Sequence, residues 1–206
     1  MKKLLSFSLA LMLLFAAFHA FSEATLSEAM GVIEGDTYSN AYMGFGFRGE
    51  GWKYSSQEEL DSTDKLAKAM MEEDSVKNLE ELGTVTIMRA TASNGFDNVG
   101  AEVTYLGTNA LILEVLGMKA FYESQADGIK QNLNAASLTV NSFEISSITV
   151  DGRDMACYRI EYSFMGIIDI AAIQFSFLQN KYMITITATA ENLEAAEQAL
   201  LNYFWL

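Results

Sequence analysis

The last third of the chain contains a succession of strand patterns whose connections are too short for anything but tight turns. We expect strands over residues 143–150, 155–164, 168–178 and 182–190. Along the second of these, apolar side chains alternate with Arg159, Glu161 and Ser163, as in a strand with one buried face. Only antiparallel neighbours can be joined by such short turns. The sequence therefore predicts an antiparallel meander in chain order.

The preceding hundred residues or so add shorter strands, which the meander would extend into a larger sheet. We expect strands at residues 42–47, 52–54, 84–91 and 99–106. Asn94-Gly95 lies between the last two and is a strong hairpin signal. The chain has no proline, so its turns depend on Gly, Asn, Asp and Ser.

Three helices are expected beside these strands. The first begins near Ser55 and Ser56, which precede Glu58 and Glu59 at the spacing of a capping box. The second covers 111–133 and is expected to pack on the sheet through one apolar face, formed by Leu111, Val115, Met118, Tyr122, Ile129 and Leu133. The third starts near Asn192, and its apolar face is formed by Leu193, Ala196, Leu200 and Phe204. Together the elements predict an α+β fold, with a single twisted, mainly antiparallel sheet flanked by helices.

The first 24 residues have the three parts of an export signal. Lys2 and Lys3 precede an apolar run over 4–18, and Ser22-Glu23-Ala24 supplies small residues at a cleavage site. We expect cleavage after Ala24, with Ala20 as the alternative site. An uncleaved anchor is the other interpretation, because the run approaches the ~20 residues that a membrane span needs. The prediction is a secreted or cell-surface protein, with a signal peptide at 1–24, a flexible leader at 25–37, one domain at 38–206, and no membrane span after cleavage.

The charge balance limits the partners. The full chain has 13 basic and 27 acidic residues; without residues 1–24 it keeps 11 and 26, a net charge of −15. Such a surface repels phosphate backbones and anionic headgroups. Nucleic acid is therefore excluded as the expected partner, and a protein or small ligand at the cell envelope remains.

Two residue types that carry much of enzyme chemistry are nearly absent. The only histidine is His19, inside the predicted signal, so the mature protein has no imidazole base or ligand. The only cysteine is Cys157, in an apolar strand, so no intramolecular disulfide forms. We expect a buried, inert thiol, with pairing to another chain as the alternative. No catalytic residue, metal site or cofactor is predicted.

Residues 38–60 resemble the opening of a group of small exported proteins of gut clostridia. The matching features are Tyr38-Ser39-Asn40-Ala41-Tyr42-Met43-Gly44-Phe45-Gly46-Phe47, then Gly51-Trp52 and Glu58-Glu59-Leu60. Asp151-Gly152-Arg153 and the run from Asn180 to Thr187 resemble later turns and strands of the same group. The resemblance implies a Mog1/PsbP-like fold, a twisted antiparallel sheet flanked by helices. It carries over no catalytic motif, and Glu50 replaces the usual proline before the Trp52 turn.

Two enzymatic interpretations and one metal interpretation stay open as minor alternatives. Ser62 and Lys65 have the Ser-x-x-Lys spacing of penicillin-binding enzymes, without the companion motifs. Paired carboxylates would suit glycoside hydrolysis. The acidic residues of 58–74 would suit calcium, but they lack the spacing of a calcium-binding loop.

Aromatic residues are the best binding candidates in the sequence. Trp52 and Tyr54 lie close together, and Trp205 lies in an aromatic run at 203–205. Exposed aromatics favour partner or carbohydrate binding. We therefore expect a non-catalytic extracytoplasmic binding or accessory module; the alternatives are an envelope-assembly factor and, less favoured, a hydrolase. A broad exposed apolar patch would favour binding or assembly, whereas two carboxylates in one cleft would favour the hydrolase.

Overall fold

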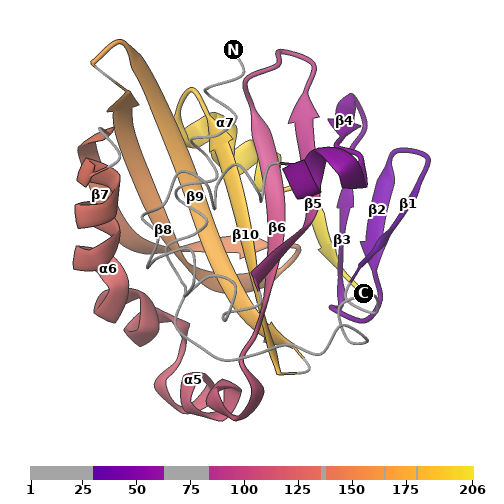
Figure 1. Cartoon of the computed structure of the whole chain (residues 1–206), viewed down its shortest axis with the longest axis horizontal. Helices are drawn as coiled ribbons and strands as arrows, with labels where there is room; N and C mark the ends of the chain where they lie inside the picture. The colour runs from indigo at the N-terminus through magenta and orange to yellow at the C-terminus, as the bar shows by residue number, and fades with distance from the viewer. Residues whose placement is uncertain (1–29, 63–83, 136–137, 165, 180) are drawn as a thin grey trace.

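The computed structural model describes residues 30–62, 84–135, 138–164, 166–179 and 181–206, which build two antiparallel sheets and the helices packed on them (Figure 1). The larger sheet has seven strands in the order β4-β5-β6-β10-β9-β8-β7. The strands are β4 (Trp52–Tyr54), β5 (Thr84–Ala92), β6 (Asn98–Tyr105), β7 (Leu138–Val150), β8 (Arg153–Phe164), β9 (Ile168–Gln179) and β10 (Tyr182–Ala190).

The predicted meander is confirmed. β7, β8, β9 and β10 are neighbours in chain order, and each pair is antiparallel. The turn from β7 to β8 places Asp151 and Gly152 at φ 45° and 78°, the left-handed region that glycine tolerates best. The predicted Asn94-Gly95 hairpin joins β5 to β6, and the Asn94 side chain accepts hydrogen bonds from the backbone N–H groups of Phe96 and Asp97.

The prediction of one sheet is wrong, because a second sheet of four short strands packs beside the first. Its order is β1-β2-β3-β11, and its members are β1 (Val32–Glu34), β2 (Thr37–Asn40), β3 (Phe45–Arg48) and β11 (Tyr203–Trp205). β1 and the start of β2 lie within 25–37, so regular structure begins before Tyr38, the predicted start of the domain. Phe204, expected on the face of a helix, is in β11.

The predicted strand at 42–47 is also corrected at its start. Residues 41–44 form a turn in which the Asn40 side chain accepts a hydrogen bond from the Met43 N–H at 2.9 Å. The Gly44 N–H bonds to the Asn40 carbonyl, and Gly44 has φ 75°. An asparagine side chain that binds backbone in this way competes with strand pairing. Only Phe45 to Arg48 are therefore free to pair as β3.

The predicted helix over 111–133 is two helices. α5 (Ala110–Leu116) follows a 3-10 turn, η2 (Gly107–Asn109), and α6 (Met118–Ala135) follows α5. Between α5 and α6, Gly117 has φ 78° and ψ 150°, which no α-helix contains. The break lets α5 lie at one end of the larger sheet, while α6 lies along β7 and β8 (Figure 1).

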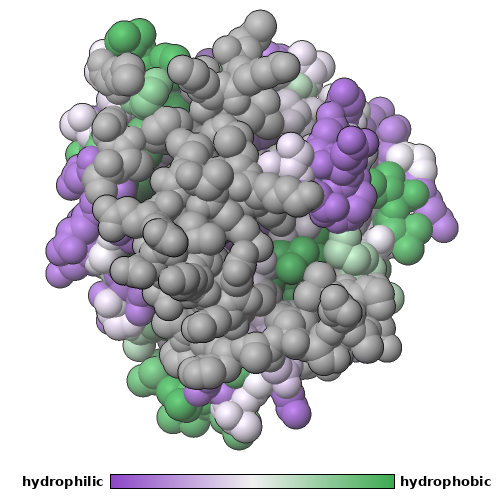
Figure 2. Space-filling model, in the orientation of Figure 1, coloured by the Kyte–Doolittle hydropathy of each residue, from purple (hydrophilic) through white to green (hydrophobic). Residues whose placement is uncertain are grey.

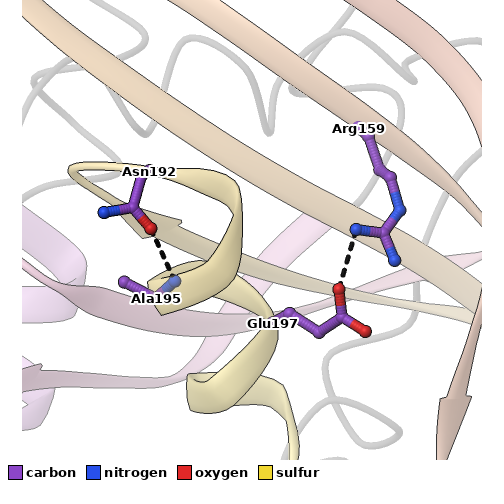
Figure 3. Close-up of polar contacts among 4 residues, drawn as sticks. All are labelled: Arg159, Asn192, Ala195 and Glu197. Carbon is purple, nitrogen blue, oxygen red and sulfur yellow. Dashed lines mark hydrogen bonds and ion pairs between the residues drawn. The ribbon is translucent and has the colours of Figure 1, made fainter.

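The other two predicted helix starts are confirmed. Ser56 and Glu59 form the capping box: Glu59 accepts from the Ser56 N–H at 2.8 Å, and the Ser56 hydroxyl accepts from the Glu59 N–H at 3.3 Å. Residues 57–62 are helical, and the remainder of that predicted helix lies outside the described residues. α7 (Leu193–Leu200) begins after Asn192, whose side chain accepts from the Ala195 N–H at 2.9 Å (Figure 3).

Apolar side chains cover both faces of the larger sheet. On one face, residues of β5, β6, β9 and β10 pack against β2, β3, β11 and α7 in the main core. On the other face, Tyr122, Ile129 and Leu133 of α6 pack against Tyr158 and Ile160 of β8. The meander is therefore sandwiched between α6 and the layer formed by α7 and the small sheet.

The helices in the described part of the chain are too short or too polar to cross a membrane. The predicted signal peptide at 1–24 lies outside the described residues.

Candidate functional site

Trp52 and Tyr54, two of the three predicted binding residues, both lie against one phenylalanine. β4 carries them along the edge of the larger sheet, opposite Ala92 and Ala90 of β5. Their rings contact Phe47 of the small sheet edge-on, with centroids 5.5 and 6.3 Å away. Both side chains are half-buried. Their contacts close one end of the space between the two sheets.

The hydroxyl of Tyr54 is fully occupied by the backbone of the small sheet. It accepts a hydrogen bond from the Tyr38 N–H at 3.1 Å, and it lies within donating distance of the Phe47 carbonyl at 3.0 Å and the Asp36 carbonyl at 3.1 Å. Burial raises the pKa of this hydroxyl. The hydroxyl therefore stays protonated near neutral pH, and its role is to hold the backbone of the small sheet.

Trp205, the third predicted binding residue, connects β11 to the turn between β7 and β8 through hydrogen bonds. Its indole N–H donates to the Val150 carbonyl at 2.9 Å, and its backbone N–H donates to the Asp151 carboxylate at 3.1 Å. The Arg153 guanidinium stacks 4.5 Å from the ring centroid, a cation–π contact. Phe177 lies against the ring at 4.9 Å. Both polar groups of Trp205 therefore have internal partners.

The structure does not gather these three side chains into one cleft. The apolar crevice beside Trp205 is closed by aromatic rings and leaves no room for a water molecule; it is lined by Phe45, Phe175, Phe177, Ile186, Tyr203 and Phe204. A binding role for Trp52, Tyr54 and Trp205 remains a prediction, and their observed role is to hold the two sheets together.

The other reactive candidates are placed as follows. Cys157 is buried in β8; burial raises the pKa of its thiol, and the nearby Arg159 guanidinium partly offsets that effect. Ser62 is exposed, and its expected partner Lys65 lies outside the described residues. Among the residues that the structure describes, no cluster of acidic, histidine or cysteine side chains has the geometry to hold a metal ion.

The most unusual surface feature is α5, which carries large apolar side chains on its outer side. The exposed fractions are 64% for Leu111, 56% for Ile112, 89% for Val115 and 56% for Leu116. Successive helix residues are ~100° apart, so these four share one continuous stripe. Figure 2 shows hydrophobic surface at this end of the molecule, over α5. We call these four residues the α5 stripe.

The helix that carries the stripe is held by its opposite side. Leu113 and Ala110 are buried against Leu106 and Met183, with Met118 and Phe121 of the next helix beside them. Expecting Leu111 and Val115 on the buried face of a continuous helix was therefore wrong. A signal was present in the sequence: 110–116 contains six apolar residues and one charge, Glu114, so it is apolar all round.

A second unusual feature lies inside, on the face of the larger sheet that α6 partly covers. The central strands place buried polar side chains in register there. Asn98 of β6 pairs with Thr189 of β10, and Thr187 of β10 pairs with Gln174 of β9. We call these four residues the polar quartet. All four are at least nine-tenths buried.

Comparisons with known proteins identify a structural likeness and no family. The structure is similar to the solution structure of cyanobacterial PsbP (CyanoP) from Synechocystis sp. PCC 6803, with a TM-score of 0.46 and 11% sequence identity. The match covers 85% of this chain and 98% of that chain. No protein-family model and no curated protein matches the sequence. A likeness of this size carries no information about function.

Proposed function

We propose that this protein is a non-catalytic extracytoplasmic binding module that docks on a protein partner through the α5 stripe. The observation that carries the proposal is the exposure of Leu111, Ile112, Val115 and Leu116 on one short helix. Apolar side chains scattered singly over a surface are ordinary, whereas a contiguous apolar patch is typical of an interaction site.

Anchoring of α5 makes the stripe suitable for docking. Leu113 fixes the helix on the body of the protein, and Gly117 fixes its angle to α6. The apolar side chains are therefore held in place before a partner arrives. A surface ordered in advance loses less conformational entropy on binding.

Net charge favours one kind of occupant over the others. A second copy of the chain would bring another strongly acidic surface to the same contact, and anionic lipid would be repelled in the same way. A partner with an apolar groove and a basic rim would instead be attracted, and its rim would face Glu114 beside the stripe. We therefore assign the stripe to a basic protein of the cell envelope.

Photocrosslinking from the stripe tests this assignment. A photoreactive amino acid at Val115 of the full exported protein should yield one crosslinked protein in the producing cells. That protein, once identified and purified, should bind the mature chain directly. The Val115→Ser and Leu111→Ser variants should weaken its affinity about tenfold or more, because they remove apolar contact area at the centre of the interface.

Ile167 provides the matched control. It is 81% exposed but lies in the turn between β8 and β9, away from α5. Ile167→Ser should leave the affinity unchanged. Three results would contradict the proposal: crosslinking of the chain only to itself, flotation of the protein with lipid vesicles that is lost in Val115→Ser, or no crosslink at Val115.

An assembly factor of the envelope is the second candidate, and the same stripe favours it. The two functions differ in the lifetime of the complex: a binding module stays with its partner, whereas an assembly factor leaves the finished structure. Measuring how long the crosslink can be captured after a pulse of synthesis separates them.

A further inference from the structure

We propose that Asn94 is a site of spontaneous deamidation that the folded protein protects and that reacts when the hairpin between β5 and β6 opens. The site belongs to a different part of the chain from the α5 stripe, and the proposal does not depend on the docking function. It rests on the one Asn-Gly pair of the chain, Asn94-Gly95, and on the hydrogen bonds that hold it.

The reaction needs only the chain and water. The backbone nitrogen of Gly95 loses its proton and attacks the side-chain amide carbon of Asn94. A new C–N bond forms, and Nδ2 of Asn94 leaves with a proton as ammonia. Water then opens the five-membered succinimide at one of its two carbonyls, which gives aspartate or isoaspartate. Glycine in the second position favours the attack, because no side chain crowds its nitrogen.

Both residues of the pair are open to solvent. Asn94 and Gly95 are exposed, and a β-carbon added to Gly95 would meet nothing within 4 Å. Water and hydroxide therefore reach the reacting atoms. Any protection of Asn94 in the folded protein must come from the conformation of the loop and not from burial.

The backbone of the loop keeps the Gly95 nitrogen away from the Asn94 amide. The Gly95 N–H donates to the Ala92 carbonyl at 2.9 Å, which closes a β-turn over 92–95. Neither Ser93 nor Asn94 has a positive φ, as in a type I turn, whose third residue has ψ of about 0°. At that angle the Gly95 nitrogen eclipses the backbone nitrogen of Asn94, whereas ring closure requires it to lie on the side of the β-carbon. The same hydrogen bond also retains the Gly95 proton.

The side chain of Asn94 is held in place as well. Its Oδ1 accepts hydrogen bonds from the N–H groups of Phe96 and Asp97, both at 3.0 Å. Its Nδ2 donates to the Asp97 carboxylate at 2.8 Å. Ring closure requires the amide to turn out of these three bonds while the β-turn changes shape. The reaction therefore proceeds from the locally opened loop, whose population is set by the free energy of opening.

The modified loop cannot form the same bonds again. An aspartate at this position replaces the Nδ2 donor with a carboxylate oxygen that faces the Asp97 carboxylate, so two like charges meet where a hydrogen bond stood. Isoaspartate instead adds a main-chain carbon to the loop that joins β5 to β6. A chain that has been modified after opening is therefore less stable than one that has stayed folded.

Mass spectrometry of the full mature protein tests the proposal. The protein is incubated at mildly alkaline pH, either folded or in guanidinium chloride, and the peptide that contains Asn94 is monitored for conversion of amide to acid. Conversion should be about tenfold or more faster in denaturant, because the closed loop reacts only through its open fraction. Asn141 is an internal comparison: it is exposed, and Ser142 follows it, so in denaturant it should react more slowly than Asn94.

Variants separate the loop conformation from the chemistry. Asp97→Ala removes the partner of Nδ2, so it should speed deamidation in the folded protein and leave the rate in denaturant unchanged. Gly95→Ala should slow the reaction in denaturant, where the fold plays no part. Asn94→Asp, which imitates one product, should lower Tm by several degrees. Gln131→Glu adds the same charge to an exposed position of α6 and should leave Tm nearly unchanged.

Distinct results would overturn the proposal. Equal rates at Asn94 in the folded and the denatured protein would show that the loop gives no protection. Absence of conversion at Asn94 in denaturant would show that it is not a deamidation site. An Asn94→Asp protein as stable as Gln131→Glu would show that the modification does not weaken the hairpin.

Discussion

The guanidinium of Arg159 donates a hydrogen bond to the carboxylate of Glu197 across 2.8 Å, and so ties the middle of β8 to α7 (Figure 3). The bond raises the pKa of Arg159 further, so the guanidinium stays charged near neutral pH. The bond thus links α7 to the strand that contains Cys157.

Glu197→Gln should lower the free energy of unfolding by about 0.5–1 kcal/mol. The loss is small because the Glu197 side chain is 41% exposed and water screens the pair. Urea denaturation at low and high salt measures it, and the difference from the unmodified protein should shrink at high salt. Glu50→Gln removes the same charge from an exposed turn and should change stability little. An equal loss in both variants would mean that net charge, not the ion pair, is responsible.

Cys157 should react slowly with thiol reagents in the folded protein. Burial raises its pKa, so the thiolate is scarce at neutral pH, and the side chain has no exposed surface. Arg159 lowers that pKa in part, so Arg159→Ala should slow labelling further if the fold stays closed. The measurement is the alkylation rate against pH. Fast labelling at pH 6 that disappears in Arg159→Ala would show instead an activated thiol.

Gly46→Ala should destabilise the small sheet. Gly46 of β3 lies opposite Phe204 of β11, and the Phe204 ring covers it so closely that a β-carbon would overlap the ring. The Arg48 guanidinium lies over the same ring, 4.5 Å from its centroid, so moving the ring would cost this contact. We expect a loss of about 1–3 kcal/mol in urea denaturation.

Gly128→Ala is the matched control for that substitution. Gly128 lies within α6, and nothing lies within 4 Å of an added β-carbon. Alanine there should stabilise the protein by about 0.5–1 kcal/mol, because glycine is the weaker helix former. Destabilisation by both alanines would argue against a steric cause at Gly46.

Stability should fall steeply as the pH rises above 10. Burial raises the pKa of Tyr38 from 10.0 to about 12. The unfolded chain therefore loses this proton at a lower pH than the folded chain. The stabilisation is complete below pH 10 and is lost as the pH rises toward 12. Burial also raises the pKa values of Tyr122, Tyr158, Tyr162 and Tyr203, which steepens the fall.

Tyr38→Phe isolates the contribution of one residue. Between pH 10 and 12, the slope of unfolding free energy against pH should become shallower by about 1.4 kcal/mol per unit, the value of one proton. Urea denaturation measures the slope, and tyrosinate absorbance follows ionisation directly. An unchanged slope would show that Tyr38 ionises freely in the folded state.

The meander was predictable because each of its parts has a local signal. Asp151-Gly152 marks a turn by residue type, and the alternation along 158–164 marks a half-buried strand. The capping box at Ser56 and Glu59 is likewise a signal contained within four residues. Such features are set by neighbours in the chain and need no knowledge of distant residues.

The second sheet and the helix break were not predictable in the same way. β1, β2, β3 and β11 have three or four residues each, too few for a recognisable period, and β11 pairs with a strand from the other end of the domain. The apolar spacing of 111–133 continues through Gly117, and a lone glycine in a helical pattern is usually tolerated. Its φ of 78° depends on how α5 packs under Met183.

The candidate sites also combine features that have a local sequence signal with features that depend on distant residues. The aromatic residues were identified by type, but the use of Trp205 depends on Val150 and Asp151, more than fifty residues earlier. The polar quartet is formed by strand register, which brings Asn98 opposite Thr189. Neither partnership can be read from spacing along the chain.

Pairing of Tyr203 with Phe47 also sets the order of events during synthesis. Because β3 must wait for residues 203–205 before β11 can cover it, the small sheet cannot close on a nascent chain until almost all of the domain has been made. The last step of folding is therefore the pairing of β11 with β3, which covers the aromatic layer.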